Sequence, residues 1–205
     1  EIEYQGRTVK LSSPHEALSL GIGMVHQDSM LIPWLSVVEN IMLGLPSGRG
    51  PLLNLGAAEK EIGRLSQAYG FQVDPGVKVW QLPMGVRQWV ESIKALYRGA
   101  KLLILDEATS VLNPTEISRL FTTIRNLVSE GCSIILITHK VEEALEISDR
   151  ITVMRDGKVV DTLLCSQANR SLLSRMIVGR EVPLQVARSG DVRASEPVLL
   201  GELHL

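Results

Sequence analysis

The chain lacks several features that mark secreted, membrane-spanning and nucleic-acid-binding proteins. Its 205 residues hold only two cysteines, Cys132 and Cys165, in no CxxC pattern, which argues against a disulfide framework or zinc site and fits a reducing cytosol. No apolar run approaches the roughly 18 residues of a membrane-spanning helix, and no charged-then-apolar leader opens the sequence. The 21 basic and 23 acidic residues give a net charge of −2, so we expect no nucleic-acid partner.

An acid pair follows a short apolar segment near the middle of the chain. Leu102 to Leu105 form a continuous apolar run, typical of a parallel strand covered on both faces, and Asp106 and Glu107 come directly after it. Open α/β sheets bind ligands at the carboxyl ends of their strands. In a nucleotide hydrolase, one such acid serves Mg²⁺ and the other serves the attacking water. Taken alone, the motif is also compatible with an acidic turn after a core strand.

The periodicity of apolar residues alternates between strand and helix, which is typical of an α/β domain. At this length we expect one domain with a helical lobe inserted between two sheet strands. Strands are expected at 2–4, 8–11, 22–26, 102–105, 133–138, 151–155 and 158–162, the last two joined by an Asp-Gly turn. Helices are expected near 14–20, 36–43, 57–69, 85–98, 115–129, 141–147 and 166–178.

Six segments in order resemble the ATP-binding subunits of ABC transporters, and more narrowly those that energise uptake of simple sugars and nucleosides. They are GIGMVHQDSMLIPWLSVVENIMLG, YGFQVDP, LPMGVRQWVESIKALYRGA, LLILDEAT, SVLNPTE and ILITHKVEEALEISDRITVMRDGKVV. The resemblance covers about residues 1–180 and implies an α/β, P-loop NTPase-like ABC ATPase domain. It divides the chain into the N-terminal part of the core (1–34), a helical signature lobe (35–98), the rest of the core (99–180), and a linker with the start of a second ATP-binding half (181–205).

The resemblance also implies roles for four residues that follow strands. Gln27 would contact Mg²⁺ and the nucleophilic water and relay the nucleotide state to the membrane partner. Asp106 would hold Mg²⁺ through its water shell, and Glu107 would polarise the attacking water. His139 would donate a hydrogen bond to the γ-phosphate while the protein orients its other ring nitrogen.

The segment at the family's Leu-Ser-Gly-Gly-Gln signature departs from that pattern. Here Pro83, Met84 and Gly85 would face ATP held by the opposite subunit, and the start of a helix should still attract a phosphate. Pro83 offers neither the hydroxyl nor the amide hydrogen of the usual serine, so we expect a weakened composite site. The loop from Ser110 to Asn113 resembles the one that crosses the dimer interface beside the partner's ATP.

Trp89 stands where the family usually has arginine or lysine, and Ala108 stands where it usually has proline. The sequence alone does not show how these two differences affect turnover.

The sequence contains no phosphate-binding loop of the form GxxxxGK[ST], which wraps phosphates with backbone amides and a lysine. Its one Gly-Lys pair, Gly157-Lys158, lacks both the earlier glycine and the following hydroxyl residue. In the family this loop and its strand precede the position of Glu1. We therefore expect a domain that lacks its N-terminal strands and phosphate loop, with both ends looking cut. The missing strand would leave unpaired backbone edges and an apolar cleft between 133–138 and 151–155.

The function implied is an ATP-hydrolysing subunit that energises an ABC importer for simple sugars or nucleosides, with ATP and Mg²⁺ as cofactors. Its partners would be a second ATP-binding domain, fused or separate, transmembrane permease subunits and, indirectly, a solute-binding protein. It would be peripheral, at the cytoplasmic face of the cell membrane. An alternative is a non-hydrolytic half that supplies its signature to ATP on a partner domain. An ATPase of DNA maintenance is a more distant reading, because the chain has no long heptad stretch and no basic face.

The loop from Met30 to Trp34 is apolar and interrupted by proline. The resemblance suggests that it receives a cytoplasmic helix of the permease. The alternative is that it covers the core of the helical lobe.

Because the sequence has no GxxxxGK[ST] motif, we predict that the isolated chain binds ATP weakly or not at all and tends to aggregate. Isothermal titration calorimetry on the purified monomer measures the affinity. A micromolar dissociation constant would contradict the prediction.

Overall fold

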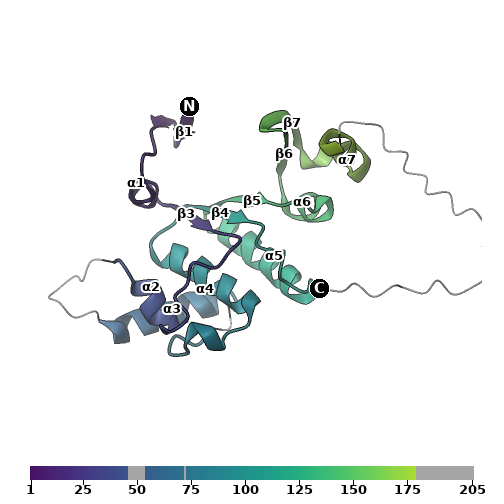
Figure 1. Cartoon of the computed structure of the whole chain (residues 1–205). Helices are drawn as coiled ribbons and strands as arrows, with labels where there is room; N and C mark the ends of the chain where they lie inside the picture. Colours follow the sequence, from purple (N-terminus) through teal and green to yellow (C-terminus); the bar gives the residue numbers. More distant parts are fainter. Residues whose placement is uncertain (46–53, 72, 179–205) are drawn as a thin grey trace, which may run out of the picture.

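The central sheet consists of three parallel strands in the order β3-β4-β5 (Figure 1). The computed structural model describes residues 1–45, 54–71 and 73–178. β3 (Ile22–Val25) pairs with β4 (Leu102–Asp106), which pairs with β5 (Ser133–Ile137). The expected strands are present, and the Asp of the acid pair is the last residue of its strand. The predicted linker and start of a second ATP-binding half, 181–205, lie outside the described residues.

One face of the sheet is packed and the other is partly open. Leu103 and Leu105 of β4 are buried in a core that includes residues of α5 (Pro114–Ser129). On the opposite face, Met24 of β3 and Ile135 of β5 lie at the same register level and are exposed. The expectation that both faces are covered was therefore wrong within the described residues, since Met24 is 40 % and Ile135 48 % exposed.

A helical lobe is inserted between β3 and β4, as the periodicity predicted. It comprises α2 (Val37–Met42), α3 (Leu55–Ala68), the short 3₁₀ helix η1 (Val79–Gln81) and α4 (Met84–Tyr97). These helices enclose their own apolar core, in which Ile41, Ile62 and Ile93 are fully buried. No helix in the described part of the chain is long and apolar enough to cross a membrane.

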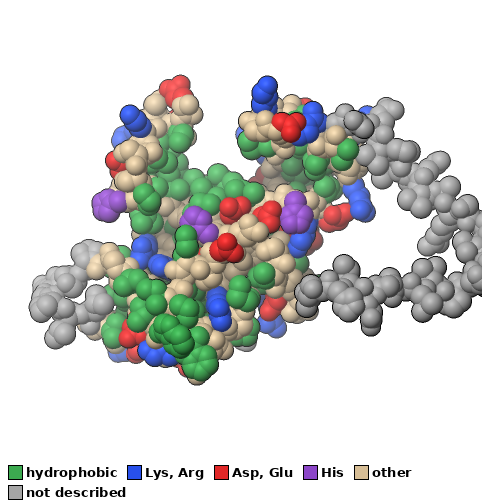
Figure 2. All heavy atoms as spheres, in the orientation of Figure 1, with side chains coloured by type: hydrophobic (Ala, Val, Ile, Leu, Met, Phe, Trp, Pro, Cys, Tyr) green, Lys and Arg blue, Asp and Glu red, His purple; other side chains and the backbone are tan. Residues whose placement is uncertain are grey.

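Two hairpins rise on either side of the sheet in Figure 1. One joins β1 (Ile2–Tyr4) to β2 (Arg7–Val9) and continues into α1 (Pro14–Ser19). The other joins β6 (Arg150–Arg155) to β7 (Lys158–Leu164) and packs with α6 (Val141–Ile147) and α7 (Arg170–Val178). The space-filling view shows a notch between the hairpins with an apolar floor (Figure 2). The predicted Asp156-Gly157 turn is confirmed, since both residues have positive φ.

The last described helix starts four residues later than the periodicity predicted. Cys165–Gln167 form a 3₁₀ turn, η2, and α7 begins only at Arg170. The Asn169 side chain accepts a hydrogen bond from the Leu172 backbone N–H, at 2.9 Å. An asparagine that satisfies a first-turn amide fixes the helix start at that point.

The start of α2 is fixed by a capping box with an added cation. Ser36 N–H donates to Glu39 Oε2 at 2.6 Å, and Glu39 N–H donates to Ser36 Oγ at 3.3 Å. Lys78, from the segment before η1, donates to the same Glu39 oxygen at 3.0 Å. The Ser36 amide, its hydroxyl and the Lys78 ammonium together lower the pKa of Glu39 from 4.5 to about 2.

We predict that ionised Glu39 stabilises the fold above about pH 4.5, and that this contribution is lost as the pH falls towards 2. Glu39→Gln removes the titrating group, so its urea midpoint should fall less between pH 6 and pH 3 than that of the unaltered chain. Glu59→Gln, on an exposed position of α3, serves as the control. An equal fall in Glu39→Gln and the unaltered chain would contradict the prediction.

Candidate active site at the carboxyl ends of β4 and β5

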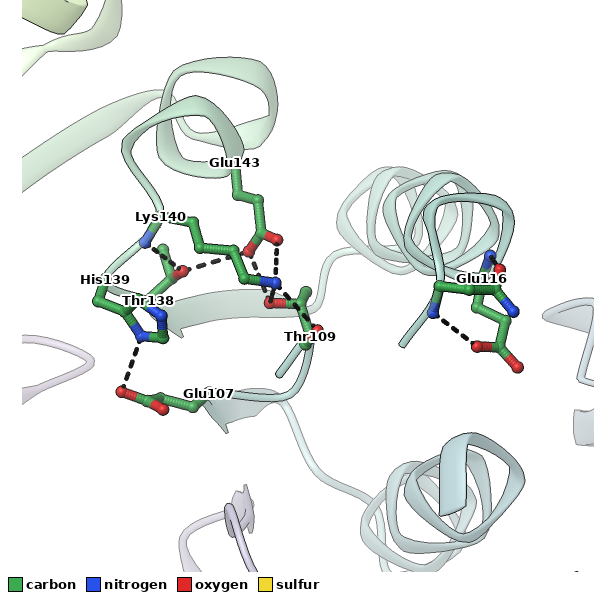
Figure 3. Close-up of polar contacts among 8 residues, drawn as sticks. Glu107, Thr109, Glu116, Thr138, His139, Lys140 and Glu143 are labelled. Carbon is green, nitrogen blue, oxygen red and sulfur yellow. Dashed lines mark hydrogen bonds and ion pairs between the residues drawn. The ribbon is translucent and has the colours of Figure 1, made fainter. Parts of the chain in front are cut away.

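The pairing of β4 with β5 brings Glu107 and His139 into contact. Asp106 lies opposite Ile137 in the parallel register, and Glu107 N–H donates to the Ile137 carbonyl at 3.0 Å. Two residues further along, His139 Nδ1 lies 3.2 Å from Glu107 Oε1 (Figure 3). The His139 side chain is 66 % exposed and the Glu107 side chain is 30 % exposed, so both can contact a ligand that arrives from solvent.

Glu107 adopts a backbone conformation that a side chain rarely favours. Its φ is 48°, in the left-handed region, directly after the strand. The turn is held on both sides, because Glu107 N–H donates to Ile137 and the Glu107 carbonyl accepts from Ser110 N–H at 3.0 Å. Residues strained in this way cluster at functional sites.

A buried carboxylate lies behind this pair. Glu143 of α6 is 7 % exposed and accepts hydrogen bonds from the hydroxyls of Thr109 (2.6 Å) and Thr138 (3.2 Å). Lys140 Nζ pairs with its other oxygen at 3.0 Å and donates to the Thr109 carbonyl at 3.1 Å. Figure 3 shows the four side chains converging between the two strand ends. The sequence analysis missed this cluster.

Gln27 and Asp106 are near the same edge but are not joined to the pair by hydrogen bonds. Gln27 follows β3 and is exposed, and Asp106 ends β4 and is half-buried. Among the described residues, no side-chain hydrogen bond connects either of them to Glu107 or His139. Their assignment to Mg²⁺ therefore stays a prediction.

The signature segment forms the start of α4 without a side-chain cap. Pro83 occupies the cap position and makes no such bond, and Met84 is exposed. Gly85 is buried: an added Cβ would lie 2.9 Å from Leu112 Cδ2 and 3.1 Å from Glu116 Oε1. The small size of this glycine thus serves packing within the chain, a role the sequence analysis did not foresee.

Two residues of the predicted interface loop behave differently. Ser110 is exposed. Asn113 caps α5, since its side chain accepts from Glu116 N–H at 3.0 Å while Glu116 reaches back to Asn113 N–H at 2.9 Å. Neither observation concerns a partner domain, so the interface roles of Ser110 and Asn113 remain predictions.

A second buried carboxylate ties α4 to the loop after Gln27. Glu91 is buried and accepts from Met30 N–H at 2.6 Å and from Ser29 Oγ at 3.1 Å. The partners are about 60 residues away in sequence, so periodicity alone could not reveal the link. The sequence offered one signal of this link, a charged residue on the apolar side of α4, because a buried carboxylate needs hydrogen-bond partners.

The donor set at the strand ends fits a magnesium–nucleotide complex only in part. Oxygen ligands suit Mg²⁺, which commonly takes one or two carboxylates together with phosphate oxygens and water. Asp106 can supply one such carboxylate. Within 1–45, 54–71 and 73–178 no group of three His, Cys, Asp or Glu residues is placed to hold a metal without a phosphate ligand.

A sheet that ends in an acid pair, with a histidine on the next strand and a helical lobe inserted between two strands, defines an ATP-binding cassette. Solved structures agree with this fold. An ATP-binding cassette of an ABC transporter in its ADP conformation, MJ1267, matches with a TM-score of 0.68 at 20 % identity, over 83 % of this chain and 71 % of that one. CbiO1 from Clostridium perfringens, part of an ABC transporter complex, matches with a TM-score of 0.67 at 22 % identity, over 91 % and 72 %.

The family profile described as ABC transporter matches residues 1–110, more than half of the chain. The glucose import ATP-binding protein TsgD13 of Haloferax volcanii is 43 % identical over 97 % of this chain and 41 % of its own length. The nucleoside import ATP-binding protein NupA of Lactococcus lactis is 45 % identical over 89 % and 36 %. This chain therefore belongs to the ABC transporter ATP-binding family, and it spans about two fifths of the length of these relatives.

The positive φ of Glu107 generates a stability prediction. Glu107→Gly should be more stable than Glu107→Ala by about 1 kcal/mol, because glycine adopts the left-handed region without a Cβ penalty. Both variants lose the carboxylate, so their difference isolates the backbone effect. Urea unfolding followed by circular dichroism gives the two free energies, and a more stable alanine variant would contradict the assigned conformation.

Proposed function

We propose that this chain is the ATP-hydrolysing core of an ABC importer for a simple sugar or a nucleoside. The observation that carries the proposal is the contact between Glu107 and His139 at the carboxyl ends of two parallel strands. A carboxylate and an imidazole in that position can orient a water and meet a terminal phosphate. The solute class rests on relatives named for glucose, nucleoside and guanosine import.

In this proposal each side chain has a separate task. Glu107 accepts a proton from the attacking water and aims it at the terminal phosphate. His139 donates a hydrogen bond to a phosphate oxygen, and Glu107 orients its ring when no ligand is present. Asp106 and Gln27 would hold Mg²⁺, which neutralises developing charge on the phosphates.

The proposed partners are a second ATP-binding domain and a membrane permease, which place the chain peripherally at the cytoplasmic face of the cell membrane. Pro83, Met84 and Gly85, with the loop from Ser110 to Asn113, would face ATP held by the second domain. A solute-binding protein would act indirectly through the permease.

The loop after β3 supports the permease contact. Met30 and Trp34 are 66 % and 75 % exposed. Trp80 is also exposed, and its backbone N–H donates to the carbonyl of Pro33, the residue before Trp34, at 3.0 Å. Exposed apolar side chains of this kind suit contact with a cytoplasmic helix. The reading in which this loop only covers the lobe accounts for buried Leu31 but not for these exposed side chains.

A second function is suggested by the start of α4, where Pro83 makes no side-chain cap and Met84 is exposed. In that reading the chain does not hydrolyse ATP itself, and it presents the start of α4 to ATP bound on a partner domain.

Glu107→Gln tests which reading holds. Added to its partner ATP-binding domain and permease, the variant should hydrolyse ATP at about 100-fold lower kcat if Glu107 is the base. Glu142→Gln, which alters an exposed carboxylate of α6, is the matched control and should leave the rate unchanged. Full activity in Glu107→Gln would contradict the hydrolytic proposal, and loss of partner hydrolysis on deleting the chain would then favour the binding half.

A further inference from the structure

The contact between Glu107 and His139 is too exposed to hold its own geometry. An exposed ion pair or hydrogen bond contributes little to stability, because water competes for both groups. His139 is 66 % exposed and lies in the short segment between β5 and α6. Something less accessible to water must fix that segment against the turn that carries Glu107.

Glu143 contacts the residues on both sides of this pair. Thr138 precedes His139 and donates its hydroxyl to Glu143 Oε2 at 3.2 Å. Lys140 follows His139 and pairs with Glu143 Oε1 at 3.0 Å. Thr109, two residues beyond Glu107, donates to Glu143 Oε2 at 2.6 Å. One buried carboxylate thus joins the two segments that carry the candidate active-site residues.

The hydrogen-bond directions in the cluster are mutually consistent. The Thr138 hydroxyl gives its hydrogen to Glu143 and accepts from Lys140 N–H at 3.0 Å. The Thr109 hydroxyl gives its hydrogen to Glu143 and accepts from Lys140 Nζ at 3.4 Å. Every donor therefore has an acceptor, and bonds to a buried charged group are among the stronger ones in proteins. Removing the carboxylate would leave two hydroxyl donors unsatisfied and would take away the charged partner of the half-buried Lys140 ammonium, which keeps only the Thr109 oxygens.

We propose that Glu143 is a positioning residue, which holds His139 against Glu107 by anchoring Thr138, Lys140 and Thr109. The effect of this positioning role on hydrolysis rests on the proposed function, whereas its effect on the contact between Glu107 and His139 does not. The neighbouring Glu142 cannot do the same, because it is exposed and pairs with Arg170 of α7 at 3.0 Å.

The test is a double-mutant cycle read by NMR on the chain in complex with its partner ATP-binding domain, without nucleotide. The imidazole ¹⁵N shift of His139 is measured at one pH in the unaltered chain, in Glu107→Gln, in Glu143→Gln and in the double variant. Glu107→Gln should move the Nδ1 signal in the unaltered chain, and that change should drop to less than about half in the Glu143→Gln background. In the Glu142→Gln background it should stay the same.

An unchanged effect of Glu107→Gln in folded Glu143→Gln would overturn the proposal. If circular dichroism shows that Glu143→Gln does not fold, Thr138→Val gives the same test, since it deletes the two hydrogen bonds of the Thr138 hydroxyl and keeps the ion pair. In the Thr138→Val background, the change in the His139 signal caused by Glu107→Gln should again be reduced, and an undiminished change would overturn the proposal.

Hydrolysis by the complex with the partner domain gives a second readout. Glu143→Gln should lower kcat about tenfold with KM for ATP within about twofold, because misplacing a reacting group affects the chemical step more than binding. A reduced NMR effect without any dependence of hydrolysis on Glu107 would support the positioning role while contradicting the proposed function.

Discussion

The parallel pairing of β4 with β5 is the constraint on which the site depends. The register sets Leu105 against Leu136 and Asp106 against Ile137, so both strands end at one edge of the sheet. The pairing continues one hydrogen bond beyond the strand, from Glu107 N–H to the Ile137 carbonyl. At Glu107 the backbone adopts the left-handed conformation. A slip of one residue would exchange the faces of the strand and separate the acid from the histidine.

Helix α4 links the sheet to the helical lobe. Val90 and Ile93 lie in the core of the lobe, whereas Ala95 lies in the core under the sheet. An added Cβ on Gly23 of β3 would lie 2.9 Å from Ala95 Cβ, so the strand and the helix approach closely. Together with the bond from Met30 N–H to Glu91, this packing gives the loop after Gln27 a direct mechanical connection to the lobe.

Periodicity predicted the alternation of elements, and most boundaries differ from the structure by one or two residues, because apolar patterning follows burial. The start of α7 was missed, since the Asn169 cap overrides an apolar pattern that extends further back. The open face of the sheet was also missed, because a continuous apolar run such as Leu102 to Leu105 is typical of a strand covered on both faces, although Ile104 is only half-buried. Motif order located Glu107 and His139, but Glu143 bonds to Thr109 across 34 residues, and such tertiary contacts leave no periodic trace.

We propose that the edge formed by β4 and β5 receives the terminal phosphate of ATP. A crystal structure of the chain in complex with its partner ATP-binding domain, Mg²⁺ and a non-hydrolysable ATP analogue would test this. We expect the terminal phosphate to lie within hydrogen-bonding reach of His139, with the metal beside Asp106. A nucleotide bound away from this edge, with Glu107 and His139 still in contact only with each other, would contradict it.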